Sequence, residues 1–536
     1  MRTIFVFCAA LTLAFCAGAN PVSGVVFHDL NTNGTREDGE PGIAGVAVSN
    51  GADVVVTAEG GNYTLEITDP GIVFVVKPTG WSPPPDPVTN TLKFYYMHRP
   101  NGSPKLKFGG FSPTGPLPRT LDFPLQPRQE TGPVRMLVLG DPQTRNFQEV
   151  QYLLRDIIAE VTGMEVDFGL TLGDNAFDNL RVFDELVQGI GRAGLPWHYV
   201  PGNHDTDYDA PSREYSYETY QRHVGPSYYA AAYGNAHILV LNDICYDLPS
   251  SDYHAELGER QLAFIRNYLA GVSSEAFIVL MMHIPIMSIK DKAALFEIIA
   301  PFKNCISLSA HTHSHGHFFL DADDGWPGEA PHHHIVQGTA CGSWYGGFYN
   351  AVGIPESVMD DGTPKGYSIL TIDGAAYDLA YRASGRPPTY QMDIHAPDRL
   401  ASDAAETDKQ VTVNFWNGTE RCRLEMRLNN GDWLPMEQVE GKAPYYAELA
   451  KRQKTFIKLV SNGRAMEELS KKELGDIRRK FKPAIGGGSP VEPSDTNHLW
   501  RATLPEGLVP GCNRVEVRAQ DMFGHTHEGR CYVYYR

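Results

Sequence analysis

From about residue 134 onward, short apolar runs alternate with amphipathic stretches, and this alternation restricts the chain to an α/β fold. Apolar runs of about four to eight residues predict buried strands, whereas apolar residues at intervals of three and four predict helices. Strands are expected at 135–139, 166–172, 197–200, 237–241, 276–282, 305–310, 366–372 and 376–381, and helices at 147–161, 180–192, 259–269 and 290–300.

Five of the expected strands are followed at once by Asp, Gln, Asn or His. Open α/β sheets bind their ligands beyond the carboxyl ends of the strands. Each segment alone would more often be a turn or an exposed loop, but five in order, each behind its own strand, predict one common site. The segments are Gly140-Asp141-Pro142-Gln143, Gly173-Asp174-Asn175, Pro201-Gly202-Asn203-His204-Asp205, His283-Ile284-Pro285 and Ala310-His311-Thr312-His313.

This ordered set resembles the calcineurin-like metallophosphoesterase family, whose pattern is D-x-H, G-D-x-x-[DN], G-N-H-[DE], H and G-H-x-H. The resemblance covers roughly residues 133–385. Among the departures from it, Gln143 stands where most members have His and Ala310 stands where most have Gly. Gln143 still offers a neutral oxygen ligand, and Ala310 affects only the local backbone freedom.

The resemblance implies a four-layer α/β/β/α sandwich with a β-sandwich on either side. The segments 338–347 (GTACGSWYGG) and 499–524 resemble a bacterial subgroup that carries N-terminal and C-terminal accessory domains. The expected parts are a signal peptide (1–19), a prealbumin-like β-sandwich (20–127), the catalytic domain (128–400), and a C-terminal β-sandwich (401–536) with a helical insertion near 447–481.

The resemblance also implies two metal ions. Asp141, Gln143 and His313 would hold the first ion and Asn203, His283 and His311 the second, with Asp174 shared between them. Two ions about 3.5–4 Å apart can activate a bridging water for attack on a phosphoester. The mixed nitrogen and oxygen ligands suit Mn, Fe or Zn.

Further residues have roles that the resemblance or the local sequence suggests. By resemblance, His204 points at the phosphate and donates a proton to the leaving group, and Asp205 could orient it. Trp344 and Tyr345 could stack on an organic part of the substrate or pack in the core. His315 and His317 are expected beside the site or on the surface, and 332–334 (three histidines) at a pocket rim or in an exposed loop.

The first nineteen residues predict export. Arg2 precedes an apolar run, and Ala17-Gly18-Ala19 is a small-x-small cleavage site. An uncleaved anchor is the alternative. We expect a periplasmic or secreted protein without a transmembrane helix. The net charge of −18 opposes nucleic-acid binding. Disulfides are permitted after export, and a pair among Cys422, Cys512 and Cys531 stays open.

Two signals lie outside the catalytic domain. Asp29, Asn31, Asn33 and Glu40 have the spacing of a calcium loop within a segment that resembles β-sandwich repeats of bacterial adhesins, although an ion-free turn is an equal alternative. The segment 451–482 has eleven Lys or Arg against four Asp or Glu, which predicts a solvated helical face or a weak cell-surface contact.

The sequence therefore favours an exported enzyme that hydrolyses a small phosphate ester. We expect a phosphodiester or diphosphate with an organic group on each side, because an aromatic pair could stack on a ring. The alternatives are a phosphomonoesterase or protein phosphatase, or an adhesion protein on a phosphoesterase-like scaffold.

Overall fold

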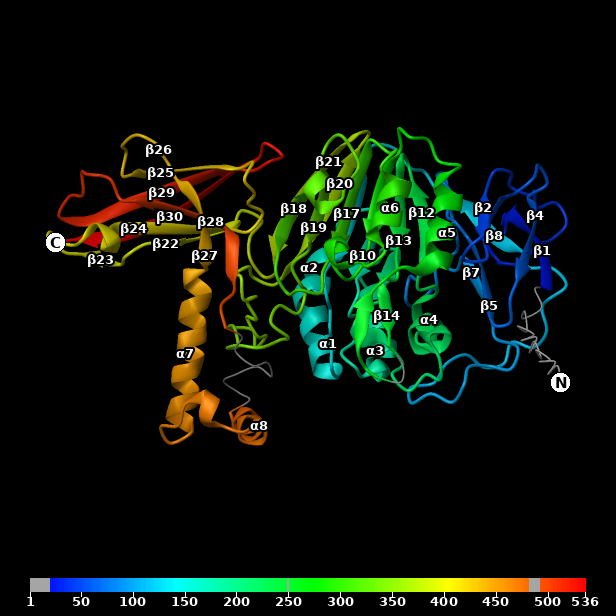
Figure 1. Cartoon of the computed structure of the whole chain (residues 1–536), viewed down its shortest axis with the longest axis horizontal. Coiled ribbons are helices and arrows are strands. Elements are labelled where there is room, and N and C mark those ends of the chain that lie inside the picture. The colour runs from blue at the N-terminus through cyan, green and yellow to red at the C-terminus, as the bar shows by residue number, and fades with distance from the viewer. Residues whose placement is uncertain (1–19, 248–249, 482–491) are drawn as a thin grey trace, which may run out of the picture.

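The computed structural model describes residues 20–247, 250–481 and 492–536. The signal peptide expected at 1–19 and part of the segment 451–482 lie outside the described residues. Figure 1 shows three bodies side by side, with the N-terminal β-strands at one end, the α/β body in the middle and the C-terminal β-strands at the other end.

Two sheets form the middle body, and together with the helices on their outer faces they confirm the expected four-layer architecture. The first sheet has the order β11-β10-β9-β20-β21, and the second has the order β12-β13-β16-β17-β19-β18. The strands of the first are β9 (Val134–Leu139), β10 (Phe168–Leu172), β11 (Trp197–Val200), β20 (Gly366–Asp373) and β21 (Ala376–Ala383). Those of the second are β12 (Tyr229–Tyr233), β13 (Ala236–Val240), β16 (Phe277–Met281), β17 (Asn304–Ser309), β18 (Gly316–Leu320) and β19 (His332–Val336).

The strands that carry the polar segments are parallel within each sheet. Each of these strands is largely buried on both faces, as their continuous apolar runs require. The helices of this body are α1 (Phe147–Leu153), continued by a π-helical turn (Leu154–Ile158) and α2 (Ala159–Val161), then α3 (Phe183–Gly191), α4 (Glu218–Val224), α5 (Gly258–Leu269) and α6 (Lys292–Ile299).

The three consecutive histidines lie in a central strand and not in a loop, so that expectation is wrong. His332, His333 and His334 form most of β19 and are buried. Hydroxyl groups contact two of the rings: the Ser307 hydroxyl lies 2.8 Å from His332 Nε2 and 2.7 Å from His334 Nδ1, and the Ser309 hydroxyl lies 2.9 Å from His334 Nε2. Burial lowers the pKa of His332 to about 4, so the ring packs as a neutral group.

The N-terminal body is a sandwich of two four-stranded sheets, as expected. Val26, Val48, Phe123 and other apolar residues fill the space between them. The sheets have the orders β4-β1-β8-β6 and β3-β2-β5-β7, with β1 (Asn20–His28), β2 (Ala47–Ser49), β3 (Val54–Val56), β4 (Asn62–Ile67), β5 (Gly71–Val75), β6 (Trp81–Ser82), β7 (Tyr95–His98) and β8 (Phe123–Pro127).

The calcium-type loop follows β1 and is closed by its own hydrogen bonds. Asp29 accepts the backbone N–H groups of Asn33 and Gly34, and Glu40 accepts those of Leu30 and Glu37. Both oxygens of each carboxylate therefore face the backbone in this arrangement. Calcium binding by Asp29, Asn31, Asn33 and Glu40 stays a prediction.

The C-terminal body is a second sandwich, with sheet orders β22-β24-β28-β27 and β23-β30-β29-β25-β26. Met392 of β22 and Leu400 of β23 are buried in its core. This body therefore begins before the boundary expected at residue 400. Its strands are β22 (Met392–His395), β23 (Arg399–Leu400), β24 (Gln410–Phe415), β25 (Arg423–Leu428), β26 (Leu434–Pro435), β27 (Glu437–Lys442), β28 (Asp495–Thr503), β29 (Gly511–Gln520) and β30 (Thr526–Tyr535).

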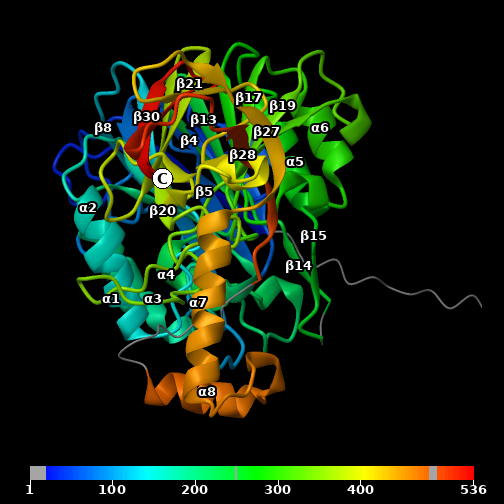
Figure 2. The same cartoon turned by 90° about the vertical axis from the view of Figure 1, so that its left-hand side faces the viewer.

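Helices α7 (Pro444–Val460) and α8 (Lys471–Lys480) form the insertion between β27 and β28. Figure 2 shows α7 extending away from the C-terminal sheets, with α8 at its far end. Tyr446 and Ala450 pack against Val358 of the middle body. Within the described part of the chain, no helix combines the length and the apolar character that crossing a membrane demands.

The hairpin β14 (Ile244–Tyr246) and β15 (Tyr253–Ala255) borders the middle body. Tyr246 and Tyr253 are paired across the hairpin, and the Tyr246 hydroxyl donates to the Asn203 carbonyl. The Tyr253 ring lies 6.3 Å from the His311 ring, so this hairpin forms one wall beside the polar strand ends.

Candidate metal centre

The five polar segments meet where the carboxyl ends of the two sheets face each other. The segments after β9, β10 and β11 come from the first sheet, and those after β16 and β17 come from the second. All seven predicted metal ligands are brought together, and all except His311 are buried: Asp141, Gln143, Asp174, Asn203, His283 and His313.

Five of these ligands have a backbone that L-residues rarely adopt. The φ angles are 23° for Asp141, 39° for Gln143, 45° for Asp174, 67° for His311 and 52° for His313. A left-handed conformation costs a non-glycine residue about 1–2 kcal/mol. Such strain clusters at functional sites, where the surrounding fold over-determines the geometry. The concentration of five such residues in one cluster fits a functional site.

Asp141 and His313 approach each other at one end of the cluster. Asp141 Oδ2 lies 3.3 Å from His313 Nε2. The Asp141 Oδ1 atom accepts the backbone N–H of His311 at 3.1 Å, which fixes the carboxylate. His313 Nδ1 donates to the Gly342 carbonyl at 2.6 Å, so the lone pair of the neutral ring is on Nε2 and faces Asp141.

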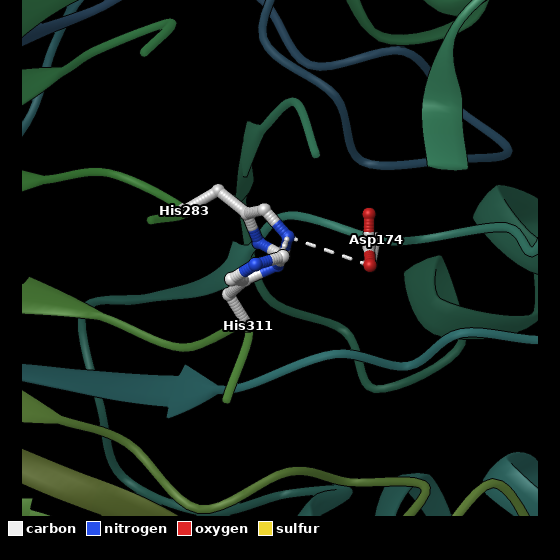
Figure 3. Close-up of side chains that lie close together, drawn as sticks. All are labelled: Asp174, His283 and His311. Atoms are coloured by element: carbon white, nitrogen blue, oxygen red, sulfur yellow. Dashed lines mark hydrogen bonds and ion pairs between the residues drawn. The ribbon is translucent and has the colours of Figure 1, made fainter. Parts of the chain in front are cut away.

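His283, His311 and Asn203 form the other end. His283 Nε2 lies 3.1 Å from Asn203 Oδ1 and 3.1 Å from His311 Nδ1. His283 Nδ1 donates to the Leu172 carbonyl at 2.7 Å, so its Nε2 also carries the lone pair. Figure 3 shows His283 and His311 side by side, with Asp174 opposite them. Donor atoms of Asp174, His283 and His311 all lie within 4.8 Å of one another.

Asp174 lies between the two ends. Its Oδ2 atom accepts from Gln143 Nε2 at 2.9 Å and lies 3.4 Å from His283 Nε2. Its Oδ1 accepts the backbone N–H of His204 at 2.8 Å. One carboxylate oxygen thus contacts a residue of each predicted ligand set.

Backbone packing around Asp174 requires glycines. A Cβ atom at Gly202 would lie 2.1 Å from the Asp174 nitrogen, and one at Gly173 would lie 2.4 Å from His283 Nδ1. Gly173 also has a φ of 92°. The glycines of the G-D and G-N-H segments therefore allow the close approach of the loops that carry the ligands.

The carboxylate charges and one buried oxygen without a hydrogen-bond partner fit a divalent cation. Asp141 Oδ2 is buried and has no hydrogen-bond partner among the described residues. Burial lowers the pKa of His283, but the nearby Asp174 and Asp141 carboxylates outweigh burial and raise it to about 10. A metal ion would neutralise the charge that causes this shift, and two imidazoles are oriented by backbone carbonyls as metal-bound histidines are.

Asp178, and not Asp205, contacts the predicted acid. His204 Nδ1 lies 2.7 Å from Asp178 Oδ1, and its ring stacks on Phe177 with 4.1 Å between centroids. His204 Nε2 is left facing the cluster, 4.0 Å from Asp174 Oδ2. Burial lowers the pKa of His204, but Asp178 and Asp174 outweigh burial and hold it above its usual value.

Asp205 has a structural role, which corrects the expectation that it orients His204. It is fully buried and accepts the backbone N–H groups of Asn175, Ala176 and Gly202 and the side-chain amide of Asn175. These bonds join the loop after β10 to the loop after β11. Sequence reasoning missed Asp178, although it stands only four residues after Asp174, just beyond the segment Gly173-Asp174-Asn175.

The expected aromatic pair divides into two environments. Tyr345 is 1% exposed, packs with Tyr152 and Ile354, and donates its hydroxyl to the Pro142 carbonyl at 2.8 Å. Tyr345 is therefore a core residue, which is the second of the two alternatives expected for it. Trp344 is half-buried and stacks on the His313 ring with 4.2 Å between centroids.

His315 and His317 continue behind the centre into the C-terminal body. His317 Nε2 and His315 Nε2 lie 2.9 Å and 3.3 Å from Asn417 Oδ1. Both rings are buried, and burial lowers their pKa values to about 4 for His317 and about 3 for His315. They support the loop of His313 and are not surface groups.

Family models match the chain in three consecutive stretches. The model of calcineurin-like phosphoesterase matches residues 134–315, that of the N-terminal part of calcineurin-like phosphoesterase matches 30–110, and that of its C-terminal part matches 334–474. The first stretch contains all seven predicted metal ligands. No curated protein matches the chain.

Two solved structures are similar to parts of it. One is the purple acid phosphatase from seeds of yellow lupin (Lupinus luteus), with 12% identity and a TM-score of 0.34, covering 68% of this chain and 67% of that one. The other is a metallophosphoesterase from Sphaerobacter thermophilus, with 14% identity and a TM-score of 0.23, covering 46% of this chain and 88% of that one.

The order of the strand-end motifs, the N-terminal and C-terminal parts that flank them, and the three matches all agree. The chain belongs to the calcineurin-like phosphoesterase family and is a metal-dependent hydrolase of phosphoesters.

Proposed function

We propose that the protein is an exported enzyme with two metal ions, which hydrolyses a phosphodiester or diphosphate of a small organic molecule. The observation that carries the dinuclear centre is the position of Asp174 Oδ2, which contacts Gln143 Nε2 at 2.9 Å and His283 Nε2 at 3.4 Å. A carboxylate placed between two groups of ligands is what a pair of ions requires.

These contacts support the two sets of ligands that the family resemblance implies. Asp141, Gln143 and His313 form the first, and Asn203, His283 and His311 form the second, with Asp174 shared. Gln143 presents Nε2 to Asp174, and a half-turn of its amide would present Oε1 at the same place. Mn, Fe or Zn would suit these donors, and when bound the ions supply an activated water and neutralise phosphate charge.

His204 is the residue that we propose to handle the leaving group. Asp178 holds Nδ1, which fixes the direction of Nε2, and Phe177 restricts the ring plane. Nε2 faces the cluster beside Asp174. A proton on this atom can pass to the leaving oxygen as its bond to phosphorus breaks.

Trp344 supports a substrate with an aromatic or sugar ring. Its ring stacks on His313, a proposed ligand, and the side chain is half-buried, so part of the indole is exposed to solvent. Stacking of a ring on an aromatic side chain contributes about 1–3 kcal/mol for nucleobases. This supports an organic ring in the substrate, and the paired assay below separates a diester or diphosphate from a monoester, which also carries one organic group.

The substrate proposal predicts a preference between two matched aryl esters. We expect a higher kcat/KM for bis-aryl or alkyl-aryl phosphodiesters than for the aryl monoester, measured with the metal-reconstituted protein. The same assay on a panel of nucleotide, sugar and lipid headgroup phosphates identifies the class. A monoester preference of about tenfold, or 1.4 kcal/mol, would contradict it.

Trp344→Ala separates ring stacking from catalysis. We expect kcat/KM for a substrate with an aromatic leaving group to fall about fivefold or more, mainly through KM, because about 1 kcal/mol or more of stacking is lost. Trp344→Phe should keep most of it. A metal analysis of each variant excludes an effect through His313. Unchanged constants in Trp344→Ala would refute stacking.

Export stays a proposal that rests on the sequence of residues 1–19. We expect the recovered protein to begin at Asn20 and to leave the cytoplasm. N-terminal sequencing of protein from a cell fractionation tests this, and a retained apolar N-terminus would support the membrane anchor instead.

Contact of the basic helices α7 and α8 with an anionic cell surface is a separate proposal, which binding to anionic vesicles would test.

A further inference from the structure

The turn between β29 and β30 reaches from the C-terminal body onto the middle body. Figure 1 shows this end of the hairpin next to β21. Phe523, in the turn, packs against the middle core, and its ring lies 5.6 Å from the Tyr377 ring of β21. The turn is therefore a contact between two bodies and not a free loop.

Four side chains with metal-binding atoms gather at this contact. Asp521, His525 and His527 belong to the turn and the start of β30, and their donor atoms lie within 4.8 Å of one another. Asp378 of β21 approaches from the other body, with Oδ1 3.6 Å from His525 Nδ1. The set is two imidazoles and two carboxylates, separate from every residue of the proposed catalytic centre.

The spacing of these atoms is that of ligands around one ion. Asp521 Oδ2 lies 3.1 Å from His527 Nε2 and 3.4 Å from His525 Nδ1. Ligands bound to zinc at about 2.0–2.1 Å in a tetrahedron are roughly 3.3 Å apart. The three close approaches are those of Asp521 to His527, of Asp521 to His525 and of Asp378 to His525. Only the first of them is also a hydrogen bond. Hydrogen bonding alone therefore does not account for the convergence.

Two details independently point to a cation. Asp378 Oδ1, the atom nearest to His525, is buried and has no hydrogen-bond partner among the described residues. Asp521 uses Oδ1 to accept the backbone N–H groups of Phe523 and His525, which aims its Oδ2 at the two imidazoles. Asp378 and Asp521 both approach His525 Nδ1, at 3.6 Å and 3.4 Å, so a cation at this point would offset the repulsion between the two carboxylates.

We propose that Asp378, Asp521, His525 and His527 bind a zinc ion that fastens the C-terminal body to the catalytic body. Two nitrogen and two oxygen ligands suit Zn²⁺ in a closed, structural site. Binding in this place adds a crosslink between β21 and the hairpin, so its free energy stabilises the contact of Phe523 with Tyr377. This site does not depend on the proposed substrate or on the dinuclear centre.

The experiment compares the full-length wild type with His525→Ala/His527→Ala, after loading with Zn²⁺ and removal of unbound metal. We expect the variant to contain one zinc fewer per chain by elemental analysis, with kcat on an aryl phosphate unchanged. His395→Ala is the matched control, because His395 is exposed on β22 of the same body and outside the cluster. This control should keep the wild-type zinc content.

Thermal unfolding distinguishes metal binding from packing. Zinc should raise the melting temperature of the wild type by several degrees more than that of the double variant, since the ion binds only the folded contact. The two proteins should unfold at similar temperatures in chelator. Equal zinc contents would overturn the proposal, and so would a loss of stability in the variant that is the same with zinc and with chelator.

Discussion

Asp174→Ala is expected to abolish both metal binding at the catalytic centre and turnover of a generic aryl phosphate. The substitution removes the one carboxylate that contacts both ligand sets, through Gln143 and His283. Loss of metal-ion stabilisation of the transition state costs several kcal/mol, so kcat/KM should fall on the order of a thousandfold or more. Elemental analysis and steady-state kinetics in Mn, Fe or Zn measure the two effects.

The matched control is Asp184→Ala, which removes an exposed carboxylate from α3 whose side chain is 71% exposed. We expect wild-type metal content and activity from this control. Circular dichroism should show that Asp174→Ala keeps its fold, because the apolar cores do not involve it. Wild-type protein that carries metal but hydrolyses no phosphate ester in a broad panel would favour a binding or adhesion protein on this scaffold.

His204→Ala is expected to keep both metal ions and to lose rate in proportion to how poor the leaving group is. General acid catalysis contributes about 10²–10⁴-fold. We expect losses of that size on alkyl esters and little loss on activated aryl esters, whose leaving oxygens need no proton. A series of leaving groups with different pKa values measures the slope. Equal losses across the series would contradict the acid role.

Asp178→Asn should also lose more rate on poor leaving groups than on good ones, but the losses should be smaller than those of His204→Ala. The reason is that Asp178 positions His204 through Nδ1 at 2.7 Å. Asp205→Asn should differ, since Asp205 accepts backbone N–H groups from two loops and contacts no reacting group. Asp205→Asn should lower the melting temperature, and any loss of rate should not depend on how poor the leaving group is. If the dependence of rate on leaving-group pKa is the same for the wild type and for Asp178→Asn, Asp178 does not position His204 for catalysis.

The sequence predicted the catalytic architecture because its signals are local. Buried parallel strands appear as apolar runs, and the residues after β9, β10, β11, β16 and β17 are fixed at their carboxyl ends by the chain itself. Parallel strands bring such ends to one edge, so a common site was expected there, and the family resemblance named the candidate ligands. The glycines at 173 and 202 are also local requirements of backbone packing.

Side-chain environments could not be predicted in the same way. Asp178 and Asp205 stand near His204 in the fold, and only the loop geometry decides which carboxylate reaches its imidazole. Tyr345 and Trp344 are neighbours in sequence, yet one is core and the other half-buried. The histidines at 332–334 looked polar enough for a loop, but serine hydroxyls on β17 make a buried strand possible.

The contact between Asp378 and the turn at 521–527 illustrates the same division most clearly. The local sequence indicates a strand around Asp378 and a turn at 521–527, but neither segment indicates that it contacts the other. Their atoms approach to 3.6 Å only because two separate bodies dock through Phe523 and Tyr377. The sequence by itself thus indicated most strands of the middle body, their succession along the chain and the types of candidate ligand, because these depend on neighbouring residues. The tertiary structure decided which carboxylates, imidazoles and rings meet, because that depends on packing between segments far apart in the chain.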